Sequence, residues 1–271
     1  MSKLPKENKF VDLSDYGRPV AIIIANSLRN TAVTPIHVTI GFIISGLIAI
    51  YCIIQGHYWL AAFFLIFKSI LDAADGELAR VKQKPSYTGR YLDSVADILL
   101  NALFFISIWY ITNTNIWICL LAFIGLQLQG TLYNYYYAIL RNKFDGDTTS
   151  RVFENKTPIA LDGEIQKHVN ILFGLYKLFY SAFDKTIYAL DSNADKGTLP
   201  NWLMTSVSTF GLGFQLLIIA AMLVLDLKAF ILPFFLVYTV MVFVFIGFRK
   251  FLYRELKEKS KKHNKTMYIR S

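Results

Sequence analysis

Long hydrophobic stretches, separated by short polar links, make up most of this 271-residue chain. A helix that crosses the hydrocarbon core of a membrane needs about 20 predominantly apolar residues. Six stretches reach this length, and each is predicted to be a transmembrane helix. They cover residues 36–55, 58–79, 91–111, 116–140, 203–225 and 229–248.

Two further segments have a different pattern. The apolar run 20–25, between Arg18 and Arg29, is too short to span and predicts an amphipathic helix in the membrane interface. The link 142–200 is too long for an ordinary helix connection. Its second half, 164–190, mixes aromatic and aliphatic residues with Lys and Asp. This mixture favours an interfacial helix over the cytoplasmic mouth of the protein, and a partly ordered loop is the alternative.

Composition supports a membrane protein. Hydrophobic residues make up 55% of the chain and charged residues 17%, and the mean hydropathy is +0.42. Soluble domains have about 45–50% apolar and about 25% charged residues. These values exclude a water-soluble protein, and two cysteines exclude a disulfide-rich scaffold. We therefore predict an all-α integral membrane fold.

The basic residues predict the orientation of this fold. All but two of the 28 lysines and arginines lie before the first span, in the links that follow the second and fourth spans, or after the last span. By the positive-inside rule, both termini and the two charged links are cytoplasmic. The net charge of +9 then reflects topology and attraction to anionic lipid, so nucleic-acid binding is not needed to explain it. The predicted parts are an interfacial segment (1–34), a six-helix membrane domain (35–253) and a basic cytoplasmic tail (254–271).

Four aspartates stand at the cytoplasmic ends of the second and third predicted helices. Asp72 and Asp75 are three residues apart, and Asp93 and Asp97 are four apart, so each pair lies on one helix face. The two helices are joined by about ten residues and must run antiparallel, so the acidic faces can meet. Ionisable residues in membrane helices are energetically costly and usually face a functional cavity.

Carboxylates this close together repel one another and favour a bound cation. Oxygen-only ligands suit Mg²⁺, Mn²⁺ or Ca²⁺ and fit zinc poorly. Four acids on two helices predict two ions about 3.5–4 Å apart. Mg²⁺ is commonly held by carboxylates together with substrate phosphates, so a phosphate-bearing substrate is expected.

Small and basic residues beside the acids support a phosphate ligand. Gly76 lies inside a helix, where glycine costs about 1 kcal/mol relative to alanine. Close approach of a ligand to the backbone would justify it. Arg80, one turn further on, can offer a planar fork to phosphate.

The pattern D-x2-D-G-x2-A-R-x8-G-x3-D-x3-D resembles the signature of the CDP-alcohol phosphotransferase family. The resemblance implies transfer of a substituted phosphate from a CDP-linked donor to an alcohol, with release of CMP. It also implies phospholipid synthesis, a Mg²⁺ or Mn²⁺ cofactor, a catalytic membrane domain and a homodimer. All eight fixed positions are present: Asp72, Asp75, Gly76, Ala79, Arg80, Gly89, Asp93 and Asp97.

The resemblance also implies roles for these residues. The first three aspartates are metal ligands, and Asp97 is both a metal ligand and the general base that deprotonates the acceptor hydroxyl. Many members carry a Pro-Asn-x-x-Thr-like motif at the first span. Pro35 and Thr39 match it, and Ile36 stands where asparagine is expected. The positions that match CDP contacts are Asp72, Gly76, Ala79, Arg80 and Gly89.

Donor and acceptor remain open. One branch of the family uses CDP-diacylglycerol with a soluble alcohol, and this branch is favoured on family grounds alone; the other uses CDP-choline or CDP-ethanolamine with diacylglycerol. The candidates for acceptor binding are Arg90, Arg141 and Arg151 at the rim. The tyrosines of 133–137 form either an aromatic wall for a quaternary amine or a lipid-facing belt.

The rival class is a cation-coupled transporter that uses the same aspartates. The full signature disfavours it. Lys68 lies one turn before Asp72 and is expected either to snorkel or to pair with an acid. Glu77 is outside the signature and is predicted to be a solvated rim residue.

Overall fold

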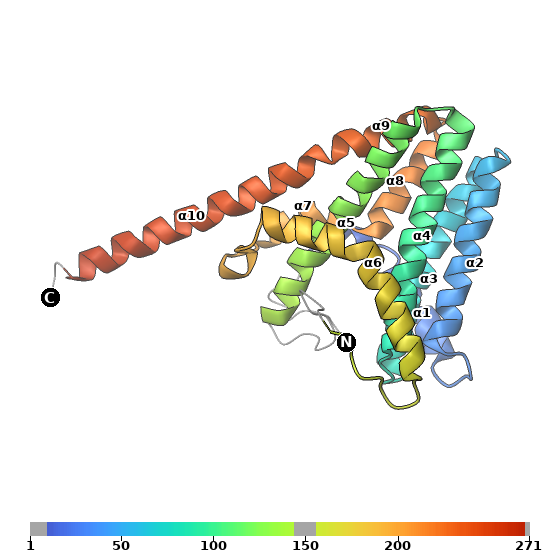
Figure 1. The fold of residues 1–271 in the computed structure, drawn as a ribbon, viewed down its shortest axis with the longest axis horizontal. Coiled ribbons are helices and arrows are strands. Elements are labelled where there is room, and N and C mark those ends of the chain that lie inside the picture. Colours follow the sequence, from blue (N-terminus) through green and yellow to red (C-terminus); the bar gives the residue numbers. More distant parts are fainter. Residues whose placement is uncertain (1–9, 144–155, 269–271) are drawn as a thin grey trace.

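A computed structural model describes residues 10–143 and 156–268, and every regular element in these ranges is helical. Most of the long helices lie side by side in a bundle, and the last one extends away from it (Figure 1). The N-terminal half contains α1 (Arg18–Leu28), α2 (Pro35–Ile54), α3 (Tyr58–Val81), α4 (Tyr87–Thr112) and α5 (Ile116–Lys143). The C-terminal half contains α6 (Gln166–Leu190), α7 (Asn201–Val207), α8 (Leu212–Val224), α9 (Lys228–Tyr238) and α10 (Val240–Tyr268).

Local signals in the sequence set the starts of α2 and α4. α2 begins with Pro35, whose fixed φ suits the first helical position, and the backbone N–H of Thr34 donates to Nδ1 of His37. α4 begins after Ser86, whose hydroxyl accepts from the backbone N–H of Gly89 at 2.8 Å. These caps fix where the first turns of both helices lie.

Four helical segments are long and apolar enough to cross a membrane. These are α2, α4, α5 and 228–255, which joins α9 to the start of α10. α7 and the short 3₁₀ turn after it would form a fifth span together with α8, but the two parts meet at an angle of 54° next to Gly211. Each predicted stretch is mostly helical, yet the count of six spans is not confirmed. α3 falls short because charged residues, Lys68 and Asp72 among them, interrupt its apolar run.

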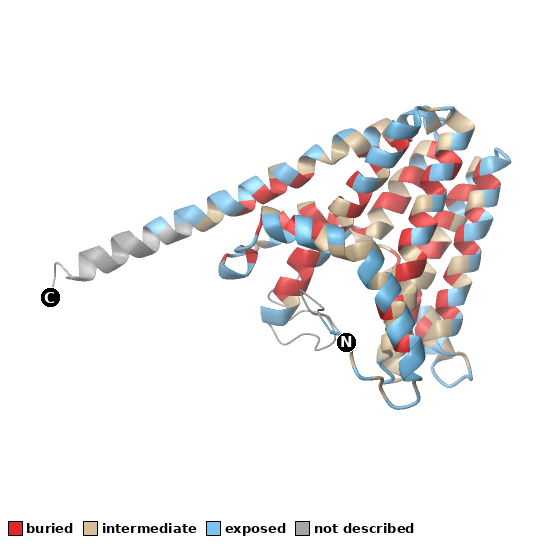
Figure 2. Ribbon diagram, viewed as in Figure 1, coloured by how far each residue is buried: buried red, intermediate tan, exposed pale blue. Residues whose placement is uncertain are grey.

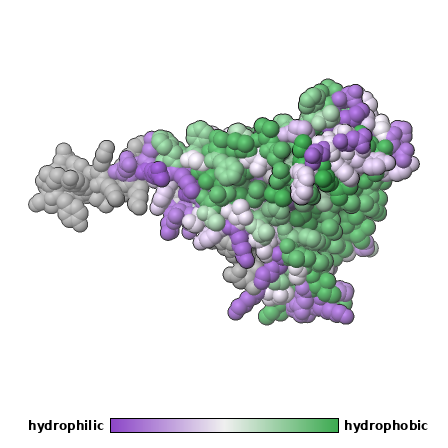
Figure 3. Space-filling view, turned by 45° about the horizontal axis from the view of Figure 1, so that its top comes forward, coloured by the Kyte–Doolittle hydropathy of each residue, from purple (hydrophilic) through white to green (hydrophobic). Residues whose placement is uncertain are grey.

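The surface of the bundle is apolar where lipid would contact it. Trp59, Leu121 and Phe234 are exposed large hydrophobic residues, and the space-filling view shows hydrophobic side chains over most of the bundle and hydrophilic ones gathered at its ends (Figure 3). Buried residues line the inward faces of the same helices (Figure 2). Apolar patches of this extent mark contact with a membrane or a partner. The fold is consistent with a multi-pass membrane protein.

The second half of the long link is a helix, as the first of its two alternatives predicted. α6 packs against α4, where Tyr91 meets the rings of Phe173 and Tyr176 at centroid distances of 5.4 Å each. Glu164, just before α6, accepts hydrogen bonds from the Ser86 hydroxyl and the Thr88 backbone N–H. The link is therefore fastened to the start of α4. The interfacial positions expected for α6 and α1 are not confirmed.

A buried ion pair joins α10 to the end of the link. Arg249 is 1% exposed, and its guanidinium binds the Asp191 carboxylate, with Nε 2.8 Å from Oδ2. The Tyr136 hydroxyl donates to the same carboxylate at 2.7 Å. Beyond this contact α10 leaves the bundle (Figure 1).

Candidate active site

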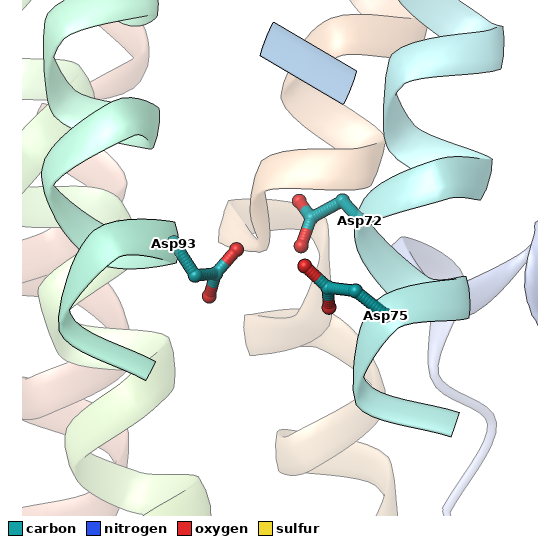
Figure 4. A group of neighbouring side chains, drawn as sticks. All are labelled: Asp72, Asp75 and Asp93. Carbon is teal, nitrogen blue, oxygen red and sulfur yellow. The ribbon is translucent and has the colours of Figure 1, made fainter. Parts of the chain in front are cut away.

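The two acidic helix faces meet. Carboxylate oxygens of Asp72, Asp75 and Asp93 all lie within 4.8 Å of one another. Figure 4 shows the first two projecting from α3 toward the third on α4. The i, i+3 spacing on α3 places its pair on one side of that helix, as the sequence predicted. The structure thus gathers three of the four signature aspartates into one cluster.

The cluster offers suitable ligand atoms for a hard cation. The hydroxyl of Thr39, on α2, donates to Asp75 Oδ2 at 2.7 Å and orients that carboxylate. Oδ1 of Asp93 is buried, and no residue in the described ranges hydrogen-bonds to it. A buried oxygen without a donor is destabilising unless something binds it. Three converging carboxylates with such an oxygen fit Mg²⁺ or Mn²⁺.

Asp97 has a different partner. The ammonium of Lys68 contacts Asp97 Oδ1, and it lies 3.0 Å from Asp72 Oδ2. Lys68 is fully buried, at 0% exposure. Of the two possibilities for this lysine, pairing with an acid is correct. Snorkelling is excluded because no part of the side chain reaches solvent.

A cavity of about 450 Å³ lies beside the cluster, bounded by α3, α4, α5, α6 and α8. All four signature aspartates line it, together with Gly76 and Arg80. Ala79 and Gly89, the other two predicted CDP contacts, do not line it. An added Cβ at Gly76 would meet nothing closer than 3.8 Å, so packing within the chain does not require glycine there. Approach of a ligand explains it better.

Glu77 corrects one prediction. It is 7% exposed rather than solvated, and its Oε1 lies 2.8 Å from Arg18 Nη2 and 2.7 Å from Arg80 Nη2. The side chain is buried because α1 packs against α3 and supplies the first of these arginines. The ion pair between Glu77 and Arg80 holds the Arg80 guanidinium at the cavity wall.

The predicted acceptor residues divide into two groups. Arg90 and Arg141 both line the cavity. Arg151 lies outside the described residues. Tyr133 and Tyr137 also line the cavity, and their rings stack at a centroid distance of 5.6 Å. All four tyrosines of this run are buried, so they do not form a lipid-facing belt.

Several lining residues were not predicted from the sequence. Asp12 and Asp15 come from the N-terminal segment, and Tyr180 and Asp184 come from α6. Long-range packing places them, and a single sequence gives no sign of it. Asn101 could have been found, since it lies one helical turn beyond Asp97 on the same face. Gln127 and Gln215, polar residues within apolar helices, carried a similar signal.

Comparison with protein-family models matches residues 32–159 to the family described as CDP-alcohol phosphatidyltransferase. The matched range runs from just before α2 into the long link and contains all eight fixed positions of the signature. No match was found among curated proteins.

Proposed function

We propose that the chain, whose residues 32–159 match the CDP-alcohol phosphatidyltransferase family, transfers a substituted phosphate group from CDP-diacylglycerol to an alcohol and releases CMP. This match supports phosphotransfer in phospholipid synthesis. The observation that carries the proposal is the convergence of Asp72, Asp75 and Asp93 on the wall of a cavity.

We propose that these three carboxylates hold a divalent ion. When bound, Mg²⁺ or Mn²⁺ there neutralises charge on the donor pyrophosphate and orients it for in-line attack. Thr39 keeps the Asp75 carboxylate in a fixed orientation. Arg80 binds Glu77 through Nε and Nη2. Its Nη1 is therefore the atom that would donate a hydrogen bond to a donor phosphate. Gly76 leaves room for that phosphate beside the helix backbone.

Asp97 is the proposed general base. Lys68 holds Oδ1 of this carboxylate, so Oδ2 is the atom that accepts the proton of the acceptor hydroxyl. The hydroxyl oxygen attacks the phosphorus that carries the donor's alcohol substituent and forms a new P–O bond. The bond from that phosphorus to the bridging oxygen breaks, and CMP leaves with the bridging oxygen and its electron pair.

A second candidate, CDP-choline or CDP-ethanolamine with diacylglycerol, is favoured by a different observation. Tyr133 and Tyr137 share the cavity with the carboxyl groups of Asp12, Asp15 and Asp184. Aromatic faces beside acidic groups bind cationic amines. The cavity would then accommodate the ammonium of a soluble headgroup. Two arginines in the same wall, Arg90 and Arg141, fit a phosphorylated acceptor instead, which belongs to the first candidate.

The test is CMP release by the purified protein with Mg²⁺, across a panel of donors and acceptors. We expect CMP with CDP-diacylglycerol and one soluble alcohol, and none after chelation of the metal. Asp97→Asn is expected to abolish release, while Asp226→Asn, an exposed aspartate before α9, leaves it unchanged. CMP formed only from CDP-choline or CDP-ethanolamine would move the protein to the second candidate. No metal-dependent CMP with any pair would refute the enzyme proposal.

Orientation and assembly are part of the proposal. The distribution of basic residues supports cytoplasmic termini and a cytoplasmic active site. Family resemblance supports a homodimer. Labelling of single cysteines placed at residues 84 and 226 in intact cells tests the first point, because only the second position is expected to react with an impermeant reagent from outside. Mass photometry in detergent tests the second.

A further inference from the structure

Lys68 is buried within the acidic cluster. Its ammonium bridges Asp72 on its own helix and Asp97 on α4, and its side chain is fully buried. The ring of Phe42 lies 4.5 Å from Nζ and closes another side of the ammonium. A buried ammonium is stable only when paired, and these two carboxylates are the acceptors that the structure gives it. Asp72 and Asp97 together hold the ammonium in this position.

The four carboxylates consequently divide into two groups. Three of them, Asp72, Asp75 and Asp93, approach within 4.8 Å of one another, as ligands of a single ion would. Asp97 is absent from that group, and its Oδ1 is already occupied by Lys68. A second divalent ion placed between Asp72 and Asp97 would lie where the ammonium already lies. Two cations cannot share that position, because they repel strongly in a buried site.

We propose that this site binds one divalent cation and that the Lys68 ammonium takes the place of a second. The inference rests on the proposed function. It replaces the two ions that the sequence predicted by one ion and the ammonium. One divalent ion and one ammonium balance three of the four carboxylate charges. Lys68 is a positioning residue: it acts through Asp97, holding Oδ1 so that Oδ2 faces the acceptor.

The first experiment counts the ions. Mn²⁺ binding to the purified full-length protein in detergent is measured by equilibrium dialysis and electron paramagnetic resonance, with and without CMP. We expect one Mn²⁺ per chain and the spectrum of an isolated ion in both conditions. Two ions per chain, or the spectrum of a magnetically coupled pair, would overturn the inference and leave the proposed transfer intact.

Variants of Lys68 test the cause of this stoichiometry. Lys68→Met removes the ammonium and frees Asp97, so a second Mn²⁺ is expected to bind. Lys68→Arg keeps the charge and is expected to keep one ion. Lys228→Met is the matched control, because Lys228 pairs with the exposed Asp226 outside the site, and it too should bind one. A single ion in folded Lys68→Met, judged by an unchanged gel-filtration profile, would contradict the inference.

Two aspartate variants keep the inference testable if the lysine variants do not fold. Asp97→Asn should retain one Mn²⁺ with affinity within about threefold of wild type, since Asp97 is not a ligand of the single ion. Asp93→Asn should bind at least tenfold more weakly, since Asp93 is one. Equal losses in both variants would show that Asp97 binds the metal and would overturn the inference. Wild-type protein that binds no ion would overturn the metal site itself, and CMP release then decides the proposed transfer separately.

Discussion

The hydroxyl of Thr39 supports the cluster of Asp72, Asp75 and Asp93 from a neighbouring helix. It reaches from α2 to Asp75 on α3 and donates at 2.7 Å to a carboxylate that is 8% exposed. A ligand held in one orientation binds metal more tightly than one that rotates, because less freedom is lost on binding. This contact also gives a physical role to Thr39, which matches the threonine of the Pro-Asn-x-x-Thr-like motif.

Replacing Thr39 by valine is expected to weaken Mn²⁺ binding by about 10–100-fold, the usual effect of losing a hydrogen bond to a metal ligand. Equilibrium dialysis of the variant measures this directly. Thr39→Ser retains the hydroxyl and should bind within a few-fold of wild type. If the valine variant binds Mn²⁺ as tightly as the serine variant, Asp75 does not depend on this bond.

At the scale of the element, two contacts hold together segments that are distant in sequence. The Glu164 carboxylate fastens the long link to the start of α4. It accepts from the Thr88 N–H at 2.7 Å, the Ser86 hydroxyl at 2.8 Å and the Leu161 N–H at 3.0 Å. The second contact is made by two glycines around the start of α8, which pack directly on Ser14 of the N-terminal segment.

Glu164 makes the first contact sensitive to pH. Burial raises the pKa of Glu164, but the hydrogen bonds from Thr88, Leu161 and Ser86 outweigh it and lower the pKa below the usual value of 4.5. The ionised form is thus favoured by folding. Its stabilisation is fully present above about pH 4.5 and is lost as pH falls through the lower, folded-state pKa.

We expect Glu164→Gln to lower the Tm at neutral pH, because the amide accepts with one oxygen and offers a donor where acceptors are needed. The difference in Tm from wild type should shrink below about pH 4.5, measured by thermal unfolding in detergent. Glu255→Gln, an exposed glutamate on α10, is the control and should shift the Tm at neither pH. A difference that grows on acidification would contradict the assigned role.

The contact between Gly213 and Ser14 predicts that a side chain added at position 213 would disturb the wall of the cavity. An added Cβ at Gly213 would lie 2.1 Å from the backbone oxygen of Ser14, which cannot move aside as a flexible side chain can. Gly213→Ala is expected to displace the N-terminal segment, which carries Asp12 and Asp15, and to lower CMP release at least tenfold. Gly174→Ala in α6 meets nothing within 4 Å and should retain full activity. Equal activities would show that the N-terminal segment is not needed at the cavity.

At the scale of the whole molecule, the contact between Asp191 and Arg249 joins the end of the long link to α10, which leaves the bundle beyond it (Figure 1). Both side chains are buried, and the Tyr135 hydroxyl adds a hydrogen bond to the Asp191 carbonyl oxygen at 2.9 Å. Breaking one side of a buried ion pair leaves an uncompensated charge, which is strongly destabilising.

Arg249→Met is therefore expected to destabilise the protein by about 3–5 kcal/mol. Thermal or denaturant unfolding in detergent measures the loss. The double variant Asp191→Asn with Arg249→Met removes the stranded carboxylate and should recover part of the stability. A single variant as stable as wild type would mean that packing alone holds α10 in place.

The sequence predicted most of the helices because runs of about 20 apolar residues have few other stable structures. It did not predict the break next to Gly211, since the mostly apolar or small residues on either side of this glycine are typical of one continuous span. In the site, helical spacing was enough to predict that Asp72 and Asp75 share a face. The pairing of Lys68 with Asp97 joins two helices, and the buried state of Glu77 depends on α1. Such contacts depend on how helices pack, which spacing along one helix does not reveal.

The cavity also has a consequence for synthesis of the chain. The aspartate cluster is complete once α4 has been synthesised, because its three residues lie on α3 and α4. The cavity is not complete until much later, since its wall includes Tyr180 on α6 and Gln215 on α8. A nascent chain that ends after α5 would carry every signature residue but would lack the parts of this wall that α6 and α8 supply. Translation in this order therefore completes the proposed ion site before the segments that enclose the cavity have been made.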